Sequence, residues 1–361
     1  MRSTGGRVPL TVSEVRIENF RGIREGAING LKRLNVFVGR NNTGKSSVLE
    51  ALYLVLTGCE SDLHGIDSLL RVITRRGWYG LPTVSTLFHS RTRSLKVSAN
   101  FESGQKETLE LSLAMPHAGE IPALRERGLK VSEVVALEVV ASGLFTLRHR
   151  FYVDSDGKPH RIVLAESRGD AVRSLLVDWE LIGGYGNVER VYSALVRLHG
   201  RRAKMRVLET LKRRFEDVED VELLPIDDRS VLHITKRETS VPFYVLGDGF
   251  KYALVRLMLL SSARRAVVLI EEPELHQHRG SLELTTRAIV DSVVEDYNQV
   301  ILTTHSLELV DLIIDVVRES GVEDLVKFYR FSLREGRLSV VDYDFEEASK
   351  LREDVEYDLR G

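Results

Sequence analysis

The sequence predicts an α/β protein with a mixed, largely parallel sheet, and three patterns along the chain support this class. Short apolar runs rich in β-branched residues alternate with helical periods in the first and last parts of the chain. Residues 95–163 instead contain short alternating segments with turn residues between them, as antiparallel strands do. Residues 170–215 place apolar side chains at helical spacing. We therefore expect a sheet lobe at 8–165 plus 264–361, with an antiparallel β subdomain, and an inserted helical lobe at 166–263.

The first elements of the chain lead to a glycine-rich segment. Residues 10–19 alternate apolar and polar side chains, as a half-buried strand does, and residues 34–38 are apolar enough for a buried strand. Residues 39–46 read Gly-Arg-Asn-Asn-Thr-Gly-Lys-Ser, and residues 47–54 have helix-forming content. A strand, this loop and a helix are the context that a phosphate-binding P-loop, or Walker A motif, requires.

The P-loop predicts that the chain binds a nucleoside triphosphate. Its glycines let backbone N–H groups point at phosphate oxygens, while Lys45 can reach the β and γ phosphates and Ser46 can ligate Mg²⁺. ATP is favoured over GTP because the sequence has no Asn-Lys-x-Asp motif to read guanine. The candidate nucleotide-binding residues of this loop are Gly39, Asn41, Asn42, Thr43, Gly44, Lys45, Ser46 and Ser47.

The predicted helical lobe carries a basic stretch. Gly200 is expected to break its helix. The basic residues could follow a phosphate backbone, but interleaved acidic residues make a solvated helix face the alternative. The stretch contains Arg197, Arg201, Arg202, Lys204, Arg206, Lys212, Arg213 and Arg214.

The last third of the chain returns to alternating strands and helices. Strands are expected at 266–270, 299–303, 325–333 and 338–343, and helices at 250–263, 281–296 and 307–319. Such alternation implies a covered sheet with the phosphates at the carboxyl ends of its strands.

Two of these strands end in residues that could act on a nucleotide. The strand at 266–270 leads into Glu271 and Glu272, the form of a Walker B element. Glu271 would hold Mg²⁺, directly or through water, and Glu272 would polarise the attacking water; a solvated acidic loop is the alternative. The next strand ends near His305, which could sense the γ phosphate or serve a structural role. Glu272, His305 and Lys45 are thus the predicted catalytic residues, and Ser46 and Glu271 the predicted metal ligands.

Two sets of motifs resemble a known family. Residues 15–23, Val-Arg-Ile-Glu-Asn-Phe-Arg-Gly-Ile, together with the P-loop resemble the opening of RecF/SMC-type ABC ATPase heads. Glu-Glu-Pro-Glu-Leu-His at 271–276 and Thr-Thr-His-Ser at 303–306 resemble the OLD-like AAA-type ATPases of that group. The resemblance implies an ABC-ATPase-head-like P-loop NTPase fold, hydrolysis of ATP with Mg²⁺, and a homodimer that forms on MgATP.

The resemblance also implies further nucleotide contacts. In such heads a signature loop of the second subunit closes the site, and its expected position here is Gly247, Asp248 and Gly249. This segment departs from the usual Leu-Ser-Gly-Gly-Gln, yet its glycines permit close approach of a phosphate to a helix N-terminus; a plain turn is the alternative. Arg21 matches an arginine that lies near the nucleotide, or else is a surface charge. Gln105 is the first candidate for the glutamine of the Q-loop.

Composition narrows the class but names no partner. The 361 residues are 43% hydrophobic and carry a net charge of −2, so a nucleic-acid contact would need a local patch. The single Cys59 excludes an intramolecular disulfide and is expected to be a small core residue. No run is long enough for a membrane helix and the first residues do not form a signal peptide, so we expect a cytoplasmic protein without membrane contact.

The favoured function is an ATP-hydrolysing switch in DNA repair or in defence against invading DNA. Its partners would be a second copy of the chain and DNA or a separate nuclease or other effector, because residues 306–361 hold no acidic cluster of the Toprim nuclease type. The alternatives are the nucleotide-binding subunit of a membrane transporter and an ATP-dependent clamp with negligible turnover. The Asn-Phe-Arg motif at 19–21 and the lack of Leu-Ser-Gly-Gly-Gln argue against the transporter.

Overall fold

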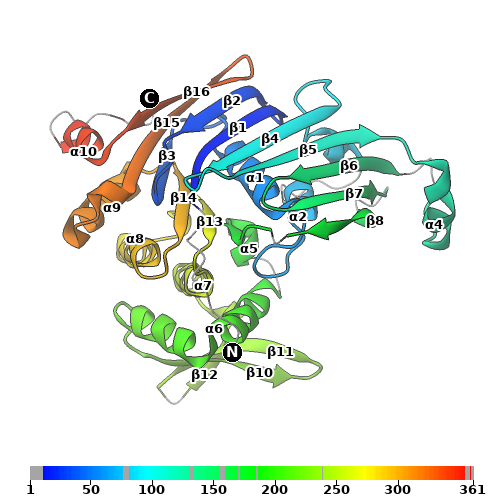
Figure 1. Cartoon of the computed structure of the whole chain (residues 1–361). Helices are drawn as coiled ribbons and strands as arrows, with labels where there is room; N and C mark the ends of the chain where they lie inside the picture. The colour runs from blue at the N-terminus through cyan, green and yellow to red at the C-terminus, as the bar shows by residue number, and fades with distance from the viewer. Residues whose placement is uncertain are drawn as a thin grey trace, which may run out of the picture.

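The computed structural model describes most of the chain (Figure 1). The described residues are 11–75, 81–130, 134–154, 159–169, 171–183, 186–237, 239–353 and 358. In these residues, 13 strands form one large mixed sheet and 3 strands form a small antiparallel sheet. The predicted α/β class with a mixed sheet is therefore confirmed.

The centre of the large sheet is parallel. Its neighbouring strands follow the order β15-β3-β14-β13-β9, and every pair among them is parallel. Their bounds are Val326–Arg334 for β15, Leu34–Val38 for β3, Gln299–Thr304 for β14, Val267–Glu271 for β13 and Ser174–Val177 for β9. All five residues of β3 are buried, because Val36 and Val38 pack into the core on one face of the sheet and Phe37 into the core on the other. A strand covered on both faces is mostly apolar, which is why residues 34–38 could be predicted. The exception is Asn35, whose buried side chain accepts from the Lys32 N–H at 2.8 Å and donates to the Lys32 carbonyl at 2.6 Å.

Helices cover both faces of this parallel region. The first core contains α1 (Lys45–Thr57) and α2 (Ser68–Thr74), with α3 (Leu81–Ser85) beside them. The second core contains α5 (Trp179–Gly183), α7 (Asp248–Ser262), α8 (Arg279–Val294), α9 (Leu307–Ser320) and α10 (Phe345–Glu353). The three helices predicted at 250–263, 281–296 and 307–319 are confirmed within two residues at each end, and Cys59 is buried as expected.

The rest of the large sheet is mainly antiparallel and forms a wing (Figure 1). Strands β4 to β8 pair in sequence order, and β1 and β2 join this wing to the β15–β16 hairpin. The bounds are Val12–Phe20 for β1, Ile23–Asn29 for β2, Ser94–Phe101 for β4, Lys106–Ala114 for β5, Val135–Ser142 for β6, Thr146–Val153 for β7, Pro159–Arg168 for β8 and Arg337–Tyr343 for β16. A short helix, α4 (Ile121–Glu126), lies between β5 and β6. The antiparallel subdomain expected from residues 95–163 is thus present.

The expected helical lobe at 166–263 differs in two ways. First, β9 belongs to the large sheet, where it pairs with β13. Second, α6 (Asn187–Lys212) packs against a small sheet of β10 (Val218–Ile226), β11 (Arg229–Lys236) and β12 (Thr239–Pro242), so the lobe is mixed and not helical. Gly200 breaks α6 as predicted, with a left-handed φ of 67° inside the helix.

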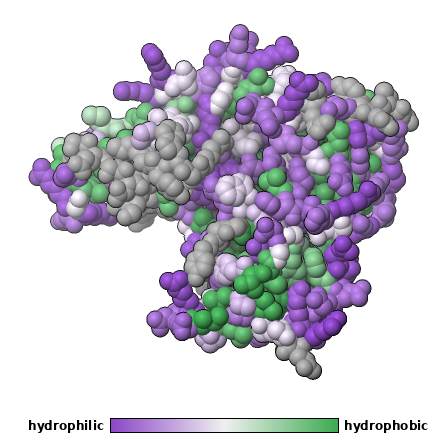
Figure 2. Space-filling model, turned by 180° about the vertical axis from the view of Figure 1, so that it is seen from behind, coloured by the Kyte–Doolittle hydropathy of each residue, from purple (hydrophilic) through white to green (hydrophobic). Residues whose placement is uncertain are grey.

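The surface is mainly polar. Figure 2 shows hydrophilic residues over most of the visible face and a gathering of hydrophobic residues on the smaller lobe. Among the described residues, no helix combines the length and the hydrophobicity needed to cross a membrane.

Candidate active site

The P-loop lies between β3 and α1, at the carboxyl edge of the parallel strands. It lines a pocket of about 330 Å³ that is formed by residues 41–47 together with Glu272 and His305. Gly44 adopts a φ of 92°, which favours glycine, and it precedes the first residue of α1. The first turn of α1 has no side-chain cap and no acidic residue. Its free N–H groups and the positive end of its dipole therefore suit an anion such as a phosphate.

Lys45 is the only lysine of this pocket, among the residues that line it, and its own loop holds it. Its Nζ donates to the carbonyl oxygens of Gly39 at 2.7 Å and Arg40 at 2.8 Å. Burial lowers the pKa of Lys45 to about 8, although the nearby carboxylates of Glu272, Glu274 and Glu271 raise it. A buried ammonium group without a carboxylate in direct contact is suited to a phosphate.

Glu272 and His305 are in contact with each other on the side of the pocket that the P-loop does not form. His305 Nε2 lies 3.0 Å from Glu272 Oε1. Glu272 has a φ of 45°, an uncommon left-handed conformation for a residue other than glycine, and its N–H donates to the carbonyl of Thr303 at 3.1 Å. Burial raises the pKa of the Glu272 carboxyl, as does the charge of Glu271, while Lys45 opposes this shift. A carboxylate with a raised pKa beside an imidazole could accept a proton from a bound water.

Glu274 fixes this arrangement, and its role could not be read from the sequence pattern. Its Oε1 accepts hydrogen bonds from Thr304 Oγ1 at 2.6 Å and from the His305 N–H at 3.0 Å. These bonds join the end of β13 to the end of β14. Glu274 therefore holds His305 beside Glu272. It positions His305 and does not itself line the pocket.

The structure does not support Glu271 as a direct magnesium ligand. Its carboxylate pairs with the Arg75 guanidinium and lies outside the pocket lining. Within the described residues, no group of three or more His, Cys, Asp or Glu side chains is arranged to hold a metal ion. Ser46 does line the pocket, which fits the tendency of Mg²⁺ to take few protein ligands and to keep phosphates and waters.

Arg21 and Arg75 belong to one buried ionic cluster. Arg75 contacts Glu50 Oε1 at 2.9 Å and Asp178 Oδ2 at 3.2 Å besides Glu271. Arg21 pairs with the other oxygen of Glu50, and its NH2 donates to the Val72 carbonyl at 2.8 Å. Only 9% of the Arg21 side chain is exposed. Arg21 is therefore not a surface charge. It does not line the pocket, and its place near the nucleotide stays a prediction.

The loop at Gly247, Asp248 and Gly249 lies apart from the P-loop of the same chain. Gly247 precedes α7, and Asp248, with 61% of its side chain exposed, pairs with Lys251 at 2.7 Å. Behind this loop, the Tyr252 ring lies 4.7 Å from the His276 ring. The start of α7 therefore contacts the segment that follows the carboxylates of β13. Gln105 lies at the start of the wing strands, between β4 and β5, and does not line the pocket.

Two family models match the chain. The model described as "AAA ATPase domain" matches residues 11–109, and the model described as "AAA domain, putative AbiEii toxin, Type IV TA system" matches residues 153–311. The first match contains the P-loop, and the second contains Glu272 and His305. The two matched segments thus supply the two sides of the pocket.

Three relatives are similar to this chain over different lengths. An ATP/GTP phosphatase of Helicobacter pylori is 21% identical, with 88% of this chain and 91% of the relative covered. The uncharacterized protein MJECL10 of Methanocaldococcus jannaschii is 39% identical over 95 residues. The match covers 43% of that protein and 26% of this chain. The DNA replication and repair protein RecF of Acinetobacter baylyi is 39% identical over 55 residues, 15% of each chain.

Among solved structures, a similar fold is found in an SMC head bound to the C-terminal winged-helix domain of ScpA. The two structures have a TM-score of 0.54 and 14% identity, and the match covers 94% of this chain and 99% of that one. The chain is a RecF/SMC-like ABC-type ATPase. The P-loop pocket is the candidate nucleotide site of this ATPase.

The ionic cluster of this ABC-type ATPase was missed because its members are distant in sequence. Glu50 is fully buried in the middle of the apolar helix α1, and Asp178 follows β9. A carboxylate inside an otherwise apolar helix is the signal that could have been used, since buried charges are almost always paired. That signal predicts a cationic partner but does not identify Arg75.

The pKa of Lys45 predicts how nucleotide binding to this ABC-type ATPase depends on pH. A bound triphosphate favours the charged lysine, so below a pKa of about 8 this group does not limit affinity. Above that pH, binding must be accompanied by proton uptake, and ATP affinity should fall by up to about tenfold per pH unit. Calorimetric titration of ATP between pH 7 and 9.5 measures this. Lys45→Arg should remove the dependence, and a flat profile for the wild type would contradict the prediction.

Proposed function

We propose that the protein is an ATP-hydrolysing switch that dimerises on MgATP. In this proposal its cellular role is DNA repair or defence against invading DNA, and a separate protein supplies the effector. The observation that carries it is the pocket in which Lys45, Ser46, Glu272 and His305 meet. A P-loop pocket that only bound nucleotide would not need a carboxylate paired with an imidazole opposite its lysine.

Each residue of the pocket would have a separate role in the hydrolysis of ATP. The N–H groups at the start of α1 and the Lys45 ammonium group would bind the phosphates, for which Lys45 would exchange its two carbonyl partners. Mg²⁺, when bound, would neutralise phosphate charge, and Ser46 would hold it. Glu272 would orient the attacking water and accept its proton, and His305 would keep Glu272 in place and sense the γ phosphate. Glu271 would reach the metal only through water, because Arg75 holds its carboxylate.

Turnover is favoured over a clamp that does not hydrolyse ATP. The raised pKa of Glu272 is appropriate for a general base, and the relative of Helicobacter pylori has the name of a phosphatase. That name includes GTP, so ATP preference rests on the sequence alone. A transporter subunit has no specific observation in its favour.

Dimerisation is favoured by the loop before α7. Gly247 has an ordinary φ of −66°, and a Cβ added there would meet nothing within 4 Å. The fold of one chain thus gives no reason for glycine at this position. A second subunit that brings its triphosphate against this helix N-terminus would give one. The similarity to the SMC head supports the same geometry only at the level of the fold.

Gly247→Asp tests this dimer. Aspartate is a good N-cap residue, so α7 should not be destabilised, but its charge would repel the triphosphate of the second subunit. We expect the mass in solution to double with magnesium and AMP-PNP for the wild type and to stay monomeric for Gly247→Asp, by light scattering. Gly119→Asp is the matched control, because Gly119 lies in the wing with nothing near its Cβ position. If Gly247→Asp still doubled its mass, this loop would not close the site.

A further inference from the structure

The amino edge of the parallel sheet, opposite the nucleotide pocket, carries a row of basic and aromatic side chains. Arg33 directly precedes β3, Tyr297 lies two residues before β14, Arg265 two residues before β13, and Arg173 directly before β9. These four strands are parallel neighbours in that order. The four residues therefore follow one another along this edge, one per strand, at about 5 Å between strands.

Tyr297 lies between two of the arginines of this row. The Arg33 Cζ is 5.6 Å and the Arg265 Cζ is 6.0 Å from the centre of its ring, within the range of a cation–π contact. The Tyr297 residue is nevertheless 52% exposed. Both Arg265 and Tyr297 have left-handed backbone, with φ of 50° and 57°, which is rare for an aromatic residue. Two loops thus present a ring flanked by positive charge to the solvent.

Buried Asn298 fixes these loops to each other. Its Oδ1 accepts from the Ala266 N–H at 3.0 Å, and its Nδ2 donates to the Ala263 carbonyl at 2.9 Å. Its own carbonyl accepts from Arg33 Nε at 3.2 Å. The three loops that carry Arg33, Arg265 and Tyr297 are therefore one connected platform and not three independent surface turns.

Three residues of this row, Arg173, Arg265 and Tyr297, line one wall of a cleft of about 780 Å³, and the second half of α6 lines the other. The sheet side contributes Arg173, Arg264, Arg265 and Tyr297, and α6 contributes His199, Arg202, Met205 and Arg206. Three carboxylates, those of Glu209, Glu295 and Asp296, also line the cleft. Arg206 pairs with Glu295 at 3.6 Å and with Asp296 at 2.6 Å, and Arg264 pairs with Asp296 at 3.1 Å. By contrast, Arg173 and Arg202 are exposed, and no described carboxylate lies within ion-pair distance of either.

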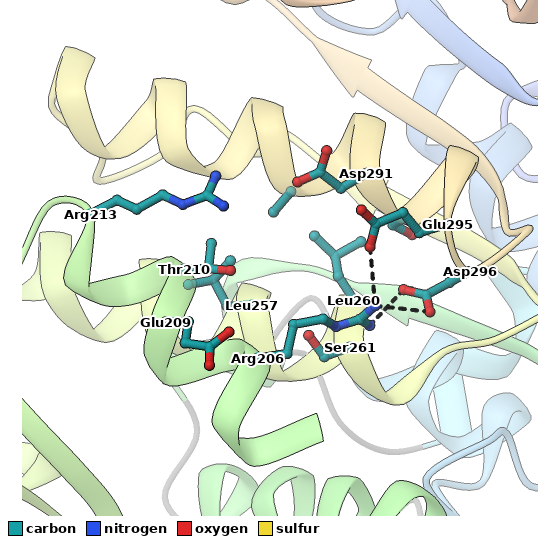
Figure 3. A pocket seen from close by; sticks show the side chains of 12 residues that line it. Arg206, Glu209, Thr210, Arg213, Leu257, Leu260, Ser261, Asp291, Glu295 and Asp296 are labelled. Carbon is teal, nitrogen blue, oxygen red and sulfur yellow. Dashed lines mark hydrogen bonds and ion pairs between the residues drawn. The ribbon is translucent and has the colours of Figure 1, made fainter. Parts of the chain in front are cut away.

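The cleft adjoins a second pocket, with which it shares Arg206, Glu209, Glu295 and Asp296. Figure 3 shows the adjoining pocket between α6, α7 and α8, where Arg206 bonds Glu295 and Asp296 and Asp291 points inward. An anion in the basic cleft would be repelled from that pocket. The basic residues predicted along residues 197–214 are thus divided, because Arg202 faces the cleft while Lys204 pairs with Asp220 at 2.7 Å.

We propose that this cleft binds single-stranded nucleic acid, with phosphates on Arg173, Arg202 and Arg265 and one base stacked on Tyr297. Charges distributed over the starts of two strands and a helix suit a chain of phosphates better than one small anion. An exposed ring beside a basic groove is the arrangement that unpaired bases use, whereas in a duplex the faces of the bases are covered. The site lies across the sheet from the P-loop, so it is distinct from the nucleotide pocket and does not depend on ATP turnover.

The test is the fluorescence anisotropy of a fluorescein-labelled 20-residue oligo(dT), without nucleotide, over a range of KCl concentrations. Arg173→Gln/Arg202→Gln should bind about tenfold or more weakly, and the slope of log affinity against log salt should shrink by about 1.4, or 0.7 for each lost phosphate contact. Tyr297→Ala should bind about fivefold or more weakly with the slope unchanged, because stacking is not ionic. Arg125→Gln/Arg127→Gln, on the exposed end of α4, removes the same charge elsewhere and should bind as the wild type does.

Three results would overturn the proposal. The first is that the wild type does not bind the oligonucleotide. The second is that the Arg173/Arg202 variant keeps both its affinity and its salt slope. The third is that the Arg125/Arg127 control loses as much affinity as the Arg173/Arg202 variant. Tighter binding of a duplex of the same length, with Tyr297→Ala neutral, would replace the single strand with double-stranded DNA as the ligand. Because the assay contains no ATP, failure here leaves the proposed ATPase unaffected, and thermal unfolding of each variant separates loss of binding from loss of fold.

Discussion

Glu272→Gln is expected to lower ATP turnover by about 10² to 10⁴-fold, the usual contribution of a positioned general base. The substitution keeps the size of the side chain and can keep a hydrogen bond to His305 Nε2, which lies 3.0 Å from Oε1 in the wild type. It removes the group that accepts a proton from water. Lys45, Ser46 and the start of α1 are unchanged, so ATP should still bind. Trapped MgATP should then hold the dimer that turnover would otherwise release.

Three measurements on one sample check this prediction: phosphate release, equilibrium binding of ATP, and mass in solution with and without MgATP. Glu126→Gln, an exposed carboxylate on α4 in the wing, is the control and should keep wild-type turnover. Unchanged turnover in Glu272→Gln would remove this residue from the catalytic role. Lost turnover with retained binding but a monomeric mass would keep the role of Glu272 and reject the dimer.

Arg75→Ala is expected to lower the free energy of unfolding by about 3–5 kcal/mol, which is the usual cost of removing one partner from a buried ion pair. Arg75 is almost fully buried and contacts three carboxylates, those of Glu50, Asp178 and Glu271. Without it, Glu50 would keep its pair with Arg21, and Asp178 would keep its pair with Arg71, which lies 2.9 Å away. Glu271 would lose its only described ionic partner, and its carboxylate would be free to turn toward the pocket.

Chemical denaturation followed by circular dichroism measures this loss. Arg287→Ala is the matched control, since Arg287 makes partly exposed pairs with Glu283 and Glu319 and should cost no more than about 1 kcal/mol. An unchanged denaturation midpoint for Arg75→Ala would show that the cluster does not contribute to stability. A change in the magnesium concentration needed for ATP binding would further show that Arg75 restrains Glu271.

The parts of the fold that could be predicted are those in which local pattern and tertiary environment agree. Four of the five residues 34–38 are apolar because β3 is covered on both faces, and α9 follows the strong amphipathic period of residues 307–319. The P-loop is a local motif, so its geometry follows from its own residues. The wing was recognisable because β4 and β5 alternate apolar and polar side chains and turn residues separate the segments that follow.

The parts that could not be predicted depend on distant contacts. β9 has only four residues, too few to show a period, and it is a strand because β13 lies beside it. Glu271 looked like a metal ligand because its motif ends a buried strand. Its partner Arg75 is 196 residues away in the sequence and follows α2. No motif spacing could therefore reveal the pair. The buried partners of Arg21 could not be predicted for the same reason, since Glu50 and the Val72 carbonyl reach it only in the folded chain.

The position of β9 beside β13 has a topological consequence for the smaller lobe. The chain leaves the sheet at the carboxyl end of β9, at Val177, and returns at the amino end of the adjacent parallel strand, at Val267. Two such strands need only a crossover of a dozen residues or so. Everything between them is therefore one enlarged crossover, anchored at opposite edges of the sheet. The same connection carries Gly247 before α7 and Arg202 on α6. Any rotation of this lobe as a rigid body would therefore move both residues together.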